Sequence, residues 1–263
     1  MTYAQGAVLG LVQGLTEFLP VSSSGHLILV PRIFGWSDQG LGVDAALHLG
    51  TLAALLAYFR LELLGLLTGA LPLRVGLLVI VATIPGAVAG LLFEKTIEAH
   101  FRWPLLIAAS TAVWGLVMWL ADRQAVDTAD RPGDPLLRIG WGQGILIGIA
   151  QMLALIPGTS RSGITITTGL FTGLDRATAA RFAFLLGIPI TAGAGAHKLL
   201  GLVRAGIPSS EAGPLLTGLL VSFASGWFAV WFLVGYLRRR SLVPFVVYRL
   251  LLAAVIIAVT LLS

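Results

Sequence analysis

The chain has 263 residues, of which 57% are hydrophobic and 11% are charged, and it contains no cysteine. Soluble domains average about 25% charged residues, so this composition excludes an ordinary soluble fold and indicates an integral membrane protein. The lack of cysteine excludes disulfides and thiol catalysis. The net charge of +5 does not indicate a nucleic-acid partner, because the basic residues stand between apolar spans, where membrane topology places them.

Apolar stretches in chain order predict an all-α polytopic integral membrane protein that forms one membrane domain over residues 1–263. A helix needs about 20 residues to cross a bilayer, and six stretches are candidates: 43–58, 75–93, 103–121, 177–202, 214–237 and 243–262. The segment 62–71 is shorter and ambiguous. Segments 1–34 and 136–174 differ, because in each two apolar halves flank a centre rich in Pro, Ser and Gly. We interpret both as re-entrant helical hairpins, whose irregular backbone must be shielded by protein or line a wet cavity.

The two interrupted segments resemble each other. Residues 13–25 read QGLTEFLPVSSSG and residues 151–163 read QMLALIPGTSRSG, so in both a Gln is followed nine residues later by Ser-x-Ser-Gly. Gly6 and Gly10 recur as Gly144 and Gly148 at the same offset of 138. This pattern predicts a duplication: a first repeat over 1–122 with a re-entrant loop near 18–26, and a second over 136–263 with one near 156–163. Glycines four residues apart are typical of close helix packing.

The distribution of Lys and Arg predicts that the two repeats have opposite orientation. Cytoplasmic loops carry an excess of these residues. Placing the triplet 238–240 in the cytoplasm puts ten basic loop residues inside and five outside. The first hairpin then enters from the outside and the second from the inside. Paired broken helices in inverted repeats mark the binding sites of many membrane proteins.

Glu17 and Gln13 are the first candidate site residues. They are four residues apart and therefore share a helix face. An ionisable residue within a membrane segment is by default a functional-site hypothesis, because its burial against lipid is costly. Hard cations prefer oxygen ligands, so Gln13 and Glu17 are candidate ligands of a divalent cation, Mg²⁺ or Ca²⁺. In the alternative interpretation, Glu17 caps a helix or pairs with Arg161.

The rest of the first loop supplies hydroxyl groups and an imidazole. Pro20 ends the helix, and the start of the next helix offers backbone amides and hydroxyls that suit an anion; the residues concerned are Ser22, Ser23, Ser24 and Gly25. His26 follows, and its near-neutral titration suits proton transfer or nucleophilic attack. The other histidines, His48, His100 and His197, lack such neighbours and are interpreted as structural or interfacial.

The second loop supplies the cation that the first loop lacks. Arg161 stands between Ser160 and Ser162, and a guanidinium group binds phosphate bidentately. Thr159, Ser160, Ser162 and Gly163 complete a predicted phosphate-binding set. Together the two loops would assemble a carboxylate, hydroxyls, an imidazole, an Arg and backbone amides, which is a set of groups suited to phosphoryl transfer.

With these residues placed, GLTEFLPVSSSGHL and PGTSRSG resemble the two signature motifs of the undecaprenyl-diphosphate phosphatase family, also called bacitracin-resistance proteins. The resemblance extends over essentially the full length and includes LHLGT at 47–51 and IPGAVAGLLF at 84–93. It implies a multi-pass enzyme of the bacterial cytoplasmic (inner) membrane with an active site that faces the periplasm. The implied reaction hydrolyses undecaprenyl diphosphate to undecaprenyl phosphate and inorganic phosphate. This recycles the lipid carrier for peptidoglycan synthesis and confers bacitracin resistance.

The resemblance also implies roles for individual residues. The acidic motif falls on Gln13 and Glu17, the Ser/His loop on Ser23 and His26, and the phosphate-binding motif on Ser160 and Arg161. Many family members have Glu where this chain has Gln13. One carboxylate rather than two is then left for a metal ion, so we expect any divalent cation to be held jointly by Glu17 and the substrate.

Our mechanistic hypothesis names Glu17, Ser23, His26 and Arg161 as catalytic. Ser23 would attack the terminal phosphorus with His26 as its base, and the alternative is direct attack by His26 through a phosphohistidine. The polyprenyl tail would lie along apolar helix faces among membrane lipid, and the resemblance makes a homodimer plausible. A different class, a polyprenyl-phosphate flippase or other membrane transporter, stays open because transporters also use inverted repeats with broken helices.

Overall fold

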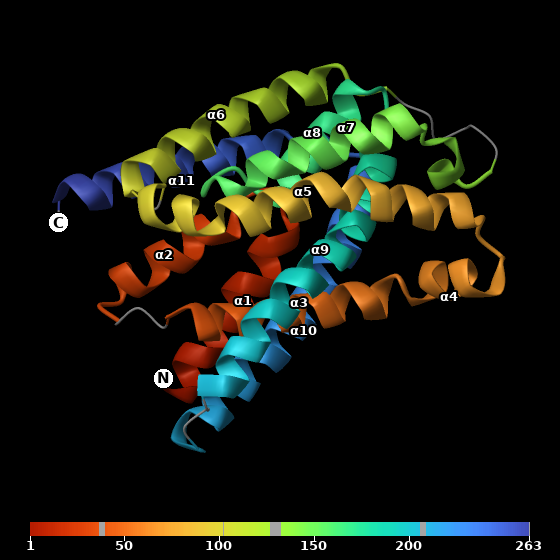
Figure 1. Ribbon diagram of the computed structural model, residues 1–263. Coiled ribbons are helices and arrows are strands. Elements are labelled where there is room, and N and C mark those ends of the chain that lie inside the picture. The colour runs from red at the N-terminus through yellow and green to blue at the C-terminus, as the bar shows by residue number, and fades with distance from the viewer. Residues whose placement is uncertain (37–39, 102, 127–132, 206–208, 263) are drawn as a thin grey trace.

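The computed structural model describes residues 1–36, 40–101, 103–126, 133–205 and 209–262. Within these ranges the backbone is helical throughout its regular parts, as the composition predicts, and Figure 1 shows the arrangement. The α-helices are α1 (Tyr3–Phe18), α2 (Ser23–Ile33), α3 (Gly40–Tyr58), α4 (Arg60–Thr68), α5 (Leu73–His100), α6 (Pro104–Arg123), α7 (Trp141–Gln151), α8 (Arg161–Phe171), α9 (Arg176–Ala205), α10 (Ser209–Leu237) and α11 (Val243–Leu262). Two short 3₁₀ helices, η1 (Pro135–Arg138) and η2 (Met152–Leu155), precede and follow α7.

Five helices of the described chain are long and apolar enough to cross a membrane: Leu73–Phe93, Pro104–Arg123, Arg176–Ala196, Glu211–Leu237 and Val243–Leu262. A sixth candidate is the pair Ala46–Tyr58 and Arg60–Thr68, which is bent by 61° at Phe59. The six predicted crossings correspond to these five or six spans, which confirms a polytopic membrane protein. The ambiguous segment 62–71 lies largely in α4, the second arm of the bent pair.

Both interrupted segments form two helices separated by a short irregular loop, 19–22 in the first and 156–160 in the second. Ser22 and Ser160 precede α2 and α8, and their φ angles are 74° and 70°, the positive values among described non-glycine residues. Such backbone conformations cost about 1–3 kcal/mol each and persist only where the surrounding structure imposes them. The same strained conformation thus occurs at two positions that the sequence repeat makes equivalent.

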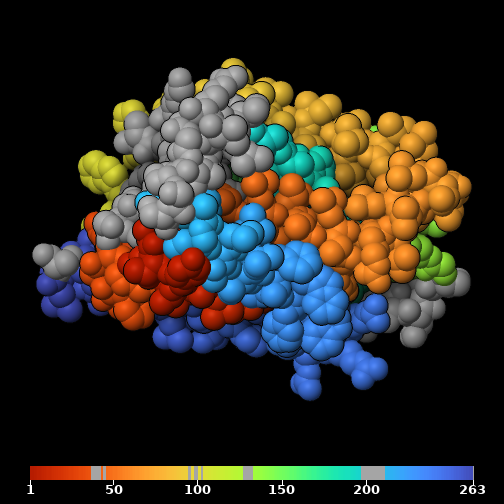
Figure 2. Space-filling view, turned by 90° about the horizontal axis from the view of Figure 1, so that it is seen from below, coloured from red at the N-terminus to blue at the C-terminus, as the bar shows by residue number. Residues whose placement is uncertain are grey.

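The repeated glycines bring helix backbones into contact, as their spacing predicts. A Cβ atom at Gly10 would collide with the backbone of Gly218 in α10, and one at Gly148 would collide with the backbone of Ala82 in α5. Thus α1 packs on α10 while its repeat equivalent α7 packs on α5, and α6 packs on α11. Figure 2 shows the N-terminal residues (red) lying against α10 (blue) on one face of the molecule.

Aromatic packing fixes the end of α1, where the first loop begins. Phe18 is 1% exposed, and its ring meets Phe184 of α9 edge to face at a centroid distance of 5.6 Å. Phe59, at the bend between α3 and α4, lies 6.4 Å from the same ring. Burying a Phe side chain stabilises a fold in water by roughly 1.5–3 kcal/mol. This cluster holds Glu17, the residue before Phe18, at a fixed place in the interior.

Candidate functional site

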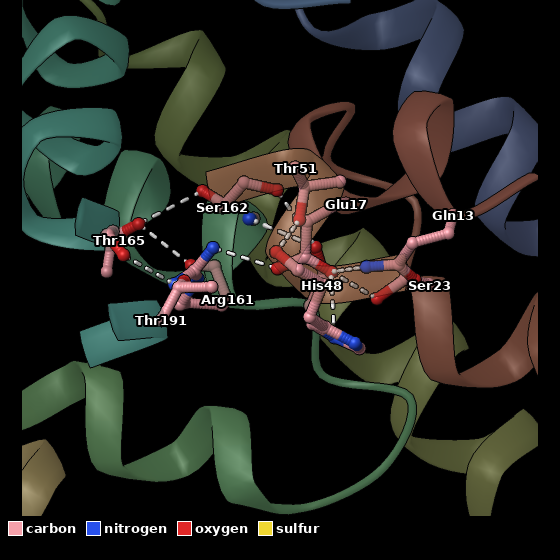
Figure 3. A network of polar contacts seen from close by, with 12 residues as sticks. Gln13, Glu17, Ser23, His48, Thr51, Arg161, Ser162, Thr165 and Thr191 are labelled. Carbon is pink, nitrogen blue, oxygen red and sulfur yellow. Dashed lines mark hydrogen bonds and ion pairs between the residues drawn. The ribbon is translucent and has the colours of Figure 1, made fainter. Parts of the chain in front are cut away.

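The site is centred on Glu17, a carboxylate that is 8% exposed (Figure 3). Its Oε1 atom accepts a hydrogen bond from Arg161 Nη2 at 2.8 Å. Its Oε2 atom accepts from Ser23 Oγ at 2.8 Å and from Gln13 Nε2 at 3.1 Å. The structure therefore brings four of the predicted site residues together, with Arg161 coming from the second repeat and the others from the first.

The guanidinium of Arg161 is held on the side of α9. Its Nη1 atom donates to the carbonyl of Gly187 at 3.1 Å and to the hydroxyl of Thr191. The side chain is 18% exposed, so part of it faces open space beside the site. Because one edge of the guanidinium is anchored to α9, the group has a fixed position from which it binds Glu17.

The predicted phosphate-binding serines also join the two loops to each other. Ser24 Oγ accepts a hydrogen bond from the amide of Gly158 at 3.4 Å, and Ser162 Oγ donates to the carbonyl of Leu19 at 3.3 Å. Thr159 is completely buried and its hydroxyl contacts that of Ser110 in α6 at 3.2 Å. The loops therefore form one continuous surface rather than two separate ones.

Within each loop the serines pair in the same way. Ser22 and Ser24 hydroxyls lie 3.2 Å apart, as do those of Ser160 and Ser162. The Ser160 hydroxyl also caps α8 by accepting from the amide of Gly163. Gly25 and Gly163 lie buried in the first turns of α2 and α8. Helix N-termini favour anions, because their first amide groups have no partner within the helix.

His26 is buried and both of its ring nitrogens are engaged. Nδ1 lies 2.7 Å from the carbonyl oxygen of Ser22, and Nε2 lies 2.6 Å from the hydroxyl of Tyr248 in α11. The hydroxyl of Ser23 is directed to Glu17 instead. In this arrangement α11 supplies the partner of His26 Nε2 and α1 supplies the acceptor for Ser23, so these contacts do not pair the histidine with the serine.

His48 in α3, which the sequence led us to interpret as structural or interfacial, lies beside Glu17. Its Nε2 atom lies 3.6 Å from Glu17 Oε2, and its side chain is 35% exposed. The sequence places His48 in the segment LHLGT at 47–51 and outside both loops, so it does not indicate the contact with Glu17. His100 accords with a structural role, because its Nδ1 atom contacts the carbonyl of Thr96. The side chain of His197 lies outside the described residues.

Arg249 in α11 is a second residue that the sequence interpretation missed. It is 1% exposed, and its guanidinium donates only to backbone carbonyls. The acceptors are Pro20 of the first loop at 3.3 Å, Gly158 and Thr159 of the second loop at 2.9 and 3.1 Å, and Thr111 of α6 at 3.0 Å. A charged residue within an apolar span is a sequence signal of function. Arg249 could therefore have been selected as a candidate from the sequence alone.

Two buried amide side chains lack hydrogen-bond partners at some of their polar atoms. In Gln13 the unpartnered atom is Oε1, whereas in Gln151 both Oε1 and Nε2 are unpartnered. These glutamines are equivalent in the sequence repeat. A free, buried amide oxygen beside a carboxylate fits a hard cation that prefers oxygen ligands. Among the described residues no three His, Asp or Glu side chains gather as a metal-binding group.

These features define a class of protein: a polytopic, all-helical membrane protein whose polar site is built from two helix-breaking Ser/Gly loops around a buried carboxylate–guanidinium pair. The sequence profile of the bacitracin resistance protein BacA family matches residues 6–255. The chain belongs to this family, which confirms the resemblance that its motifs indicate.

Similar proteins from three bacteria cover nearly the whole chain. Each is named undecaprenyl-diphosphatase. The protein of Moorella thermoacetica is 49% identical over 266 residues, that of Geobacter sulfurreducens 47% over 274, and that of Alcanivorax borkumensis 45% over 267. In every case the alignment includes 98% of this chain and 98% of the relative. The likeness therefore extends over both repeats and both loops.

Proposed function

We propose that this protein is an undecaprenyl-diphosphate phosphatase, a hydrolase that releases inorganic phosphate from the lipid diphosphate and regenerates undecaprenyl phosphate for peptidoglycan synthesis. The names of its relatives and its family support this function and do not favour the transporter alternative. The observation that carries the proposal is the meeting of Ser23, Glu17 and Arg161 at the junction of the two loops. The proposed nucleophile, Ser23, and the proposed phosphate-binding cation, Arg161, thereby both contact Glu17, the proposed proton acceptor.

In the proposed reaction the substrate competes with Glu17 for Arg161. The diphosphate oxygens take up the guanidinium, which matches them bidentately, and the carboxylate loses its strongest partner. Glu17 then accepts the proton of Ser23, whose hydroxyl already donates to it at 2.8 Å. The Ser23 Oγ–P bond forms as the bond from phosphorus to the bridging oxygen breaks, and undecaprenyl phosphate leaves. Water then attacks the phosphoserine and releases inorganic phosphate.

The alternative nucleophile is His26. Its Nε2 atom would have to leave the hydroxyl of Tyr248 before it could attack phosphorus. The contact between Ser23 and Glu17 supports Ser23 as the nucleophile, and His26 is then a proton-exchanging group near it. Attack by Ser23 leaves a phosphoserine and attack by His26 leaves a phosphohistidine, so trapping the phosphoenzyme distinguishes the two routes.

The first turns of α2 and α8 would hold the non-reacting oxygens of the diphosphate. Their backbone amides and the hydroxyls of the paired serines are preorganised, which is how enzymes stabilise the charge of a phosphoryl-transfer transition state. The residues proposed for this role are Ser22, Ser24, Gly25, Thr159, Ser160, Ser162 and Gly163. Because several of these hydroxyls already join the loops, they would bind phosphate without first being ordered.

A divalent cation, Mg²⁺ or Ca²⁺, is proposed at Glu17 and shared with the substrate. Support comes from the buried, unpartnered Oε1 atom of Gln13 and from the adjacent carboxylate. Such an ion would neutralise charge on the diphosphate and the leaving group. Glu17 already accepts from Arg161, Ser23 and Gln13, so it would become available to the ion only when the diphosphate draws Arg161 away.

The lipid tail has a candidate path beside the site. A mostly apolar pocket between α2, α6 and α11 includes Gly25. Its other lining residues are Ile28, Leu29, Arg32, Pro104, Ile107, Ile256, Val259 and Thr260. We propose that the first isoprene units lie there and that the rest of the tail extends into membrane lipid. Measuring kcat/KM for farnesyl and undecaprenyl diphosphates tests this. Ile28→Trp should lower kcat/KM for undecaprenyl diphosphate more than Leu116→Trp does. Leu116 is the control because it occupies an exposed position of α6.

The site is proposed to face the periplasm of a bacterial inner membrane, with the two broken helix pairs as re-entrant hairpins of inverted repeats. The excess of Lys and Arg in the loops that we place in the cytoplasm supports this orientation. The helix packing also supports it, because α1 lies on α10 whereas its equivalent in the second segment, α7, lies on α5. A homodimer is proposed from the family resemblance alone. Accessibility of cysteines introduced at Ser37 and Ser241 to a membrane-impermeant reagent would test the orientation.

The decisive experiment is phosphate release from undecaprenyl diphosphate by the purified protein in detergent, with and without EDTA. Wild-type protein should release phosphate, and Glu17→Gln, Ser23→Ala and Arg161→Gln should not, while remaining folded. Loss of activity on chelation would support the shared cation. Trapping the phosphoenzyme separates the nucleophiles, because phosphoserine survives acid and phosphohistidine does not. Folded wild-type protein that releases no phosphate would overturn the proposed function.

A further inference from the structure

The structure brings a tyrosine from the last helix onto the histidine of the first loop. The hydroxyl of Tyr248 lies 2.6 Å from His26 Nε2. The two rings are nearly parallel, with an interplanar angle of 9° and a centroid distance of 5.6 Å. His26 is 8% exposed and Tyr248 is 44% exposed. The tyrosine is therefore partly exposed on the surface of α11, whereas the imidazole that it contacts is buried.

The hydrogen-bond partners of His26 determine which nitrogen carries its proton. The carbonyl oxygen of Ser22 can only accept, so Nδ1, which lies 2.7 Å from it, must be the protonated nitrogen. In the neutral imidazole Nε2 is then an acceptor, and the hydroxyl of Tyr248 donates to it. The second lone pair of the tyrosine oxygen stays available to another donor.

The acceptor on the Nδ1 side is itself fixed by the strained loop. Ser22 is the residue with a φ of 74°, and its carbonyl reaches the side chain of His26 four residues later. One end of the imidazole is thus held by the first loop and the other by α11. Partners of this kind set the tautomer and ring orientation of functional histidines in many enzymes.

We propose that Tyr248 is a positioning residue of this site, which holds His26 with Nδ1 protonated and Nε2 as the proton acceptor. The inference rests on the proposed phosphatase function, because it assigns His26 a proton-exchanging role beside Ser23. The positioning itself moves no proton, since the tyrosine keeps its hydroxyl proton and Nδ1 keeps the proton of the neutral imidazole.

Tyr248→Phe tests this proposal because it keeps the stacked ring and removes only the hydroxyl. Tyr236→Phe is the matched control, since Tyr236 in α10 packs edge to face on Phe245 away from His26. With undecaprenyl diphosphate, Tyr248→Phe should lower kcat by about 10- to 100-fold, the range typical of lost orienting partners, and leave KM within about two-fold of wild type. Tyr236→Phe should leave both parameters unchanged.

Two further readouts separate positioning from a general structural role. In a His26→Gln background, Tyr248→Phe should cause no additional loss, because residues that act through one another are not additive. The ¹⁵N spectrum of histidine-labelled protein should show a protonated Nδ1 for His26 in the wild type, and the Nε2 resonance should move in Tyr248→Phe. Unchanged kcat, an equal loss in the His26→Gln background, or a protonated Nε2 would each overturn the proposal.

The spectroscopic readout does not depend on catalysis. If wild-type protein releases no phosphate, the proposed function fails, yet the tautomer of His26 is still measured. If wild-type protein is active and the tautomer is the opposite one, the role of Tyr248 fails while the phosphatase function stands.

Discussion

Ser23 and Arg161 occupy equivalent positions in the two repeated segments and donate to the two different oxygens of Glu17. They are separated by the same offset of 138 residues that relates the two loops, and each is the first residue of a helix that follows a serine with positive φ. Both donor–acceptor distances are 2.8 Å. The two similar segments thus form one asymmetric site, in which a hydroxyl and a guanidinium bind different oxygens of a single carboxylate. In the second copy Leu155 stands where the first has Glu17.

Replacing Arg161 should abolish most of the phosphate release. Arg161→Gln removes the charge that we propose binds the diphosphate, and we expect kcat/KM to fall by at least about 100-fold, as for loss of a transition-state donor. Arg161→Lys keeps the charge but loses the planar fork and should lie between this variant and wild type. The control is Arg181→Gln, since Arg181 pairs with Glu62 and Asp134 outside the site. Activity of Arg161→Gln near the wild-type level would contradict the assignment.

The equivalent glutamines should respond differently to the same substitution. Gln13→Met removes a donor to Glu17 at 3.1 Å and should lower kcat/KM by about 10-fold, the effect of roughly one lost hydrogen bond to a charged group. Gln151→Met replaces a buried amide whose polar atoms have no partner, so stability should be unchanged or rise by about 1 kcal/mol. Assays of both variants, with thermal unfolding in detergent, check this. Equal loss of activity in the two variants would refute it.

The sequence predicts those parts of the fold and site that local pattern determines. Apolar runs of about 20 residues define the spans, and the repeated Ser-x-Ser-Gly motif defines both loops. Glu17 and Arg161 stand out because each is a charge in an otherwise apolar segment, and their pairing was the alternative to a cation site at Glu17. The structure adds the exact oxygen that each donor binds.

Other parts of the site depend on tertiary packing and leave no local pattern. Tyr248 meets His26 across most of the chain's length, and the sequence around the tyrosine does not indicate which loop its helix will approach. His48 is brought to Glu17 by the packing of α3 on α1. Arg249 is different, because an Arg within an apolar span is itself a signal; only its acceptors, all backbone carbonyls, required the structure.

Substituting His48 should reduce activity, because its imidazole lies beside the proposed catalytic carboxylate. Its Nε2 atom is 3.6 Å from Glu17 Oε2. His48→Gln removes the ring from this position and should lower kcat/KM for undecaprenyl diphosphate. His100→Gln, at the end of α5, provides the control and should leave kcat/KM unchanged. Wild-type kcat/KM in His48→Gln would contradict a role for His48 at Glu17.

Arg249 should be required for the arrangement of both loops. Arg249→Met removes a donor from four buried carbonyls, of which that of Gly158 keeps the hydroxyl of Thr111 as a second donor. Each carbonyl left unsatisfied costs roughly 1–3 kcal/mol. We expect the Tm in detergent to fall by at least about 10 °C and phosphate release to be lost.

Arg74→Met is the matched control for Arg249→Met, because Arg74 also binds two backbone carbonyls, those of Leu137 and Ile139, away from the loops. That variant should lose stability but keep its activity per folded molecule. Arg249→Met that is both stable and active would refute this role.

Adding one methyl group at two glycines of α7 should have opposite effects on stability. At Gly148 a Cβ atom would collide with the backbone of Ala82, so Gly148→Ala forces α7 away from α5 and should destabilise the protein by about 1–3 kcal/mol. At Gly142 nothing lies within 4 Å of the added atom. Gly142→Ala should therefore leave stability unchanged or raise it by up to about 1 kcal/mol, because Ala favours helix.

Thermal unfolding of the two variants in the same detergent measures this difference, and phosphate release extends the test to function. Because α7 leads directly into the second loop, displacing it should also move Arg161 relative to Glu17, and Gly148→Ala should lose activity where Gly142→Ala does not. If both variants shifted Tm in the same direction and by the same amount, the close packing of α7 on α5 would not be what stabilises this part of the fold. The position of the second loop would then have to be set by Arg249 and the contacts between the loops alone.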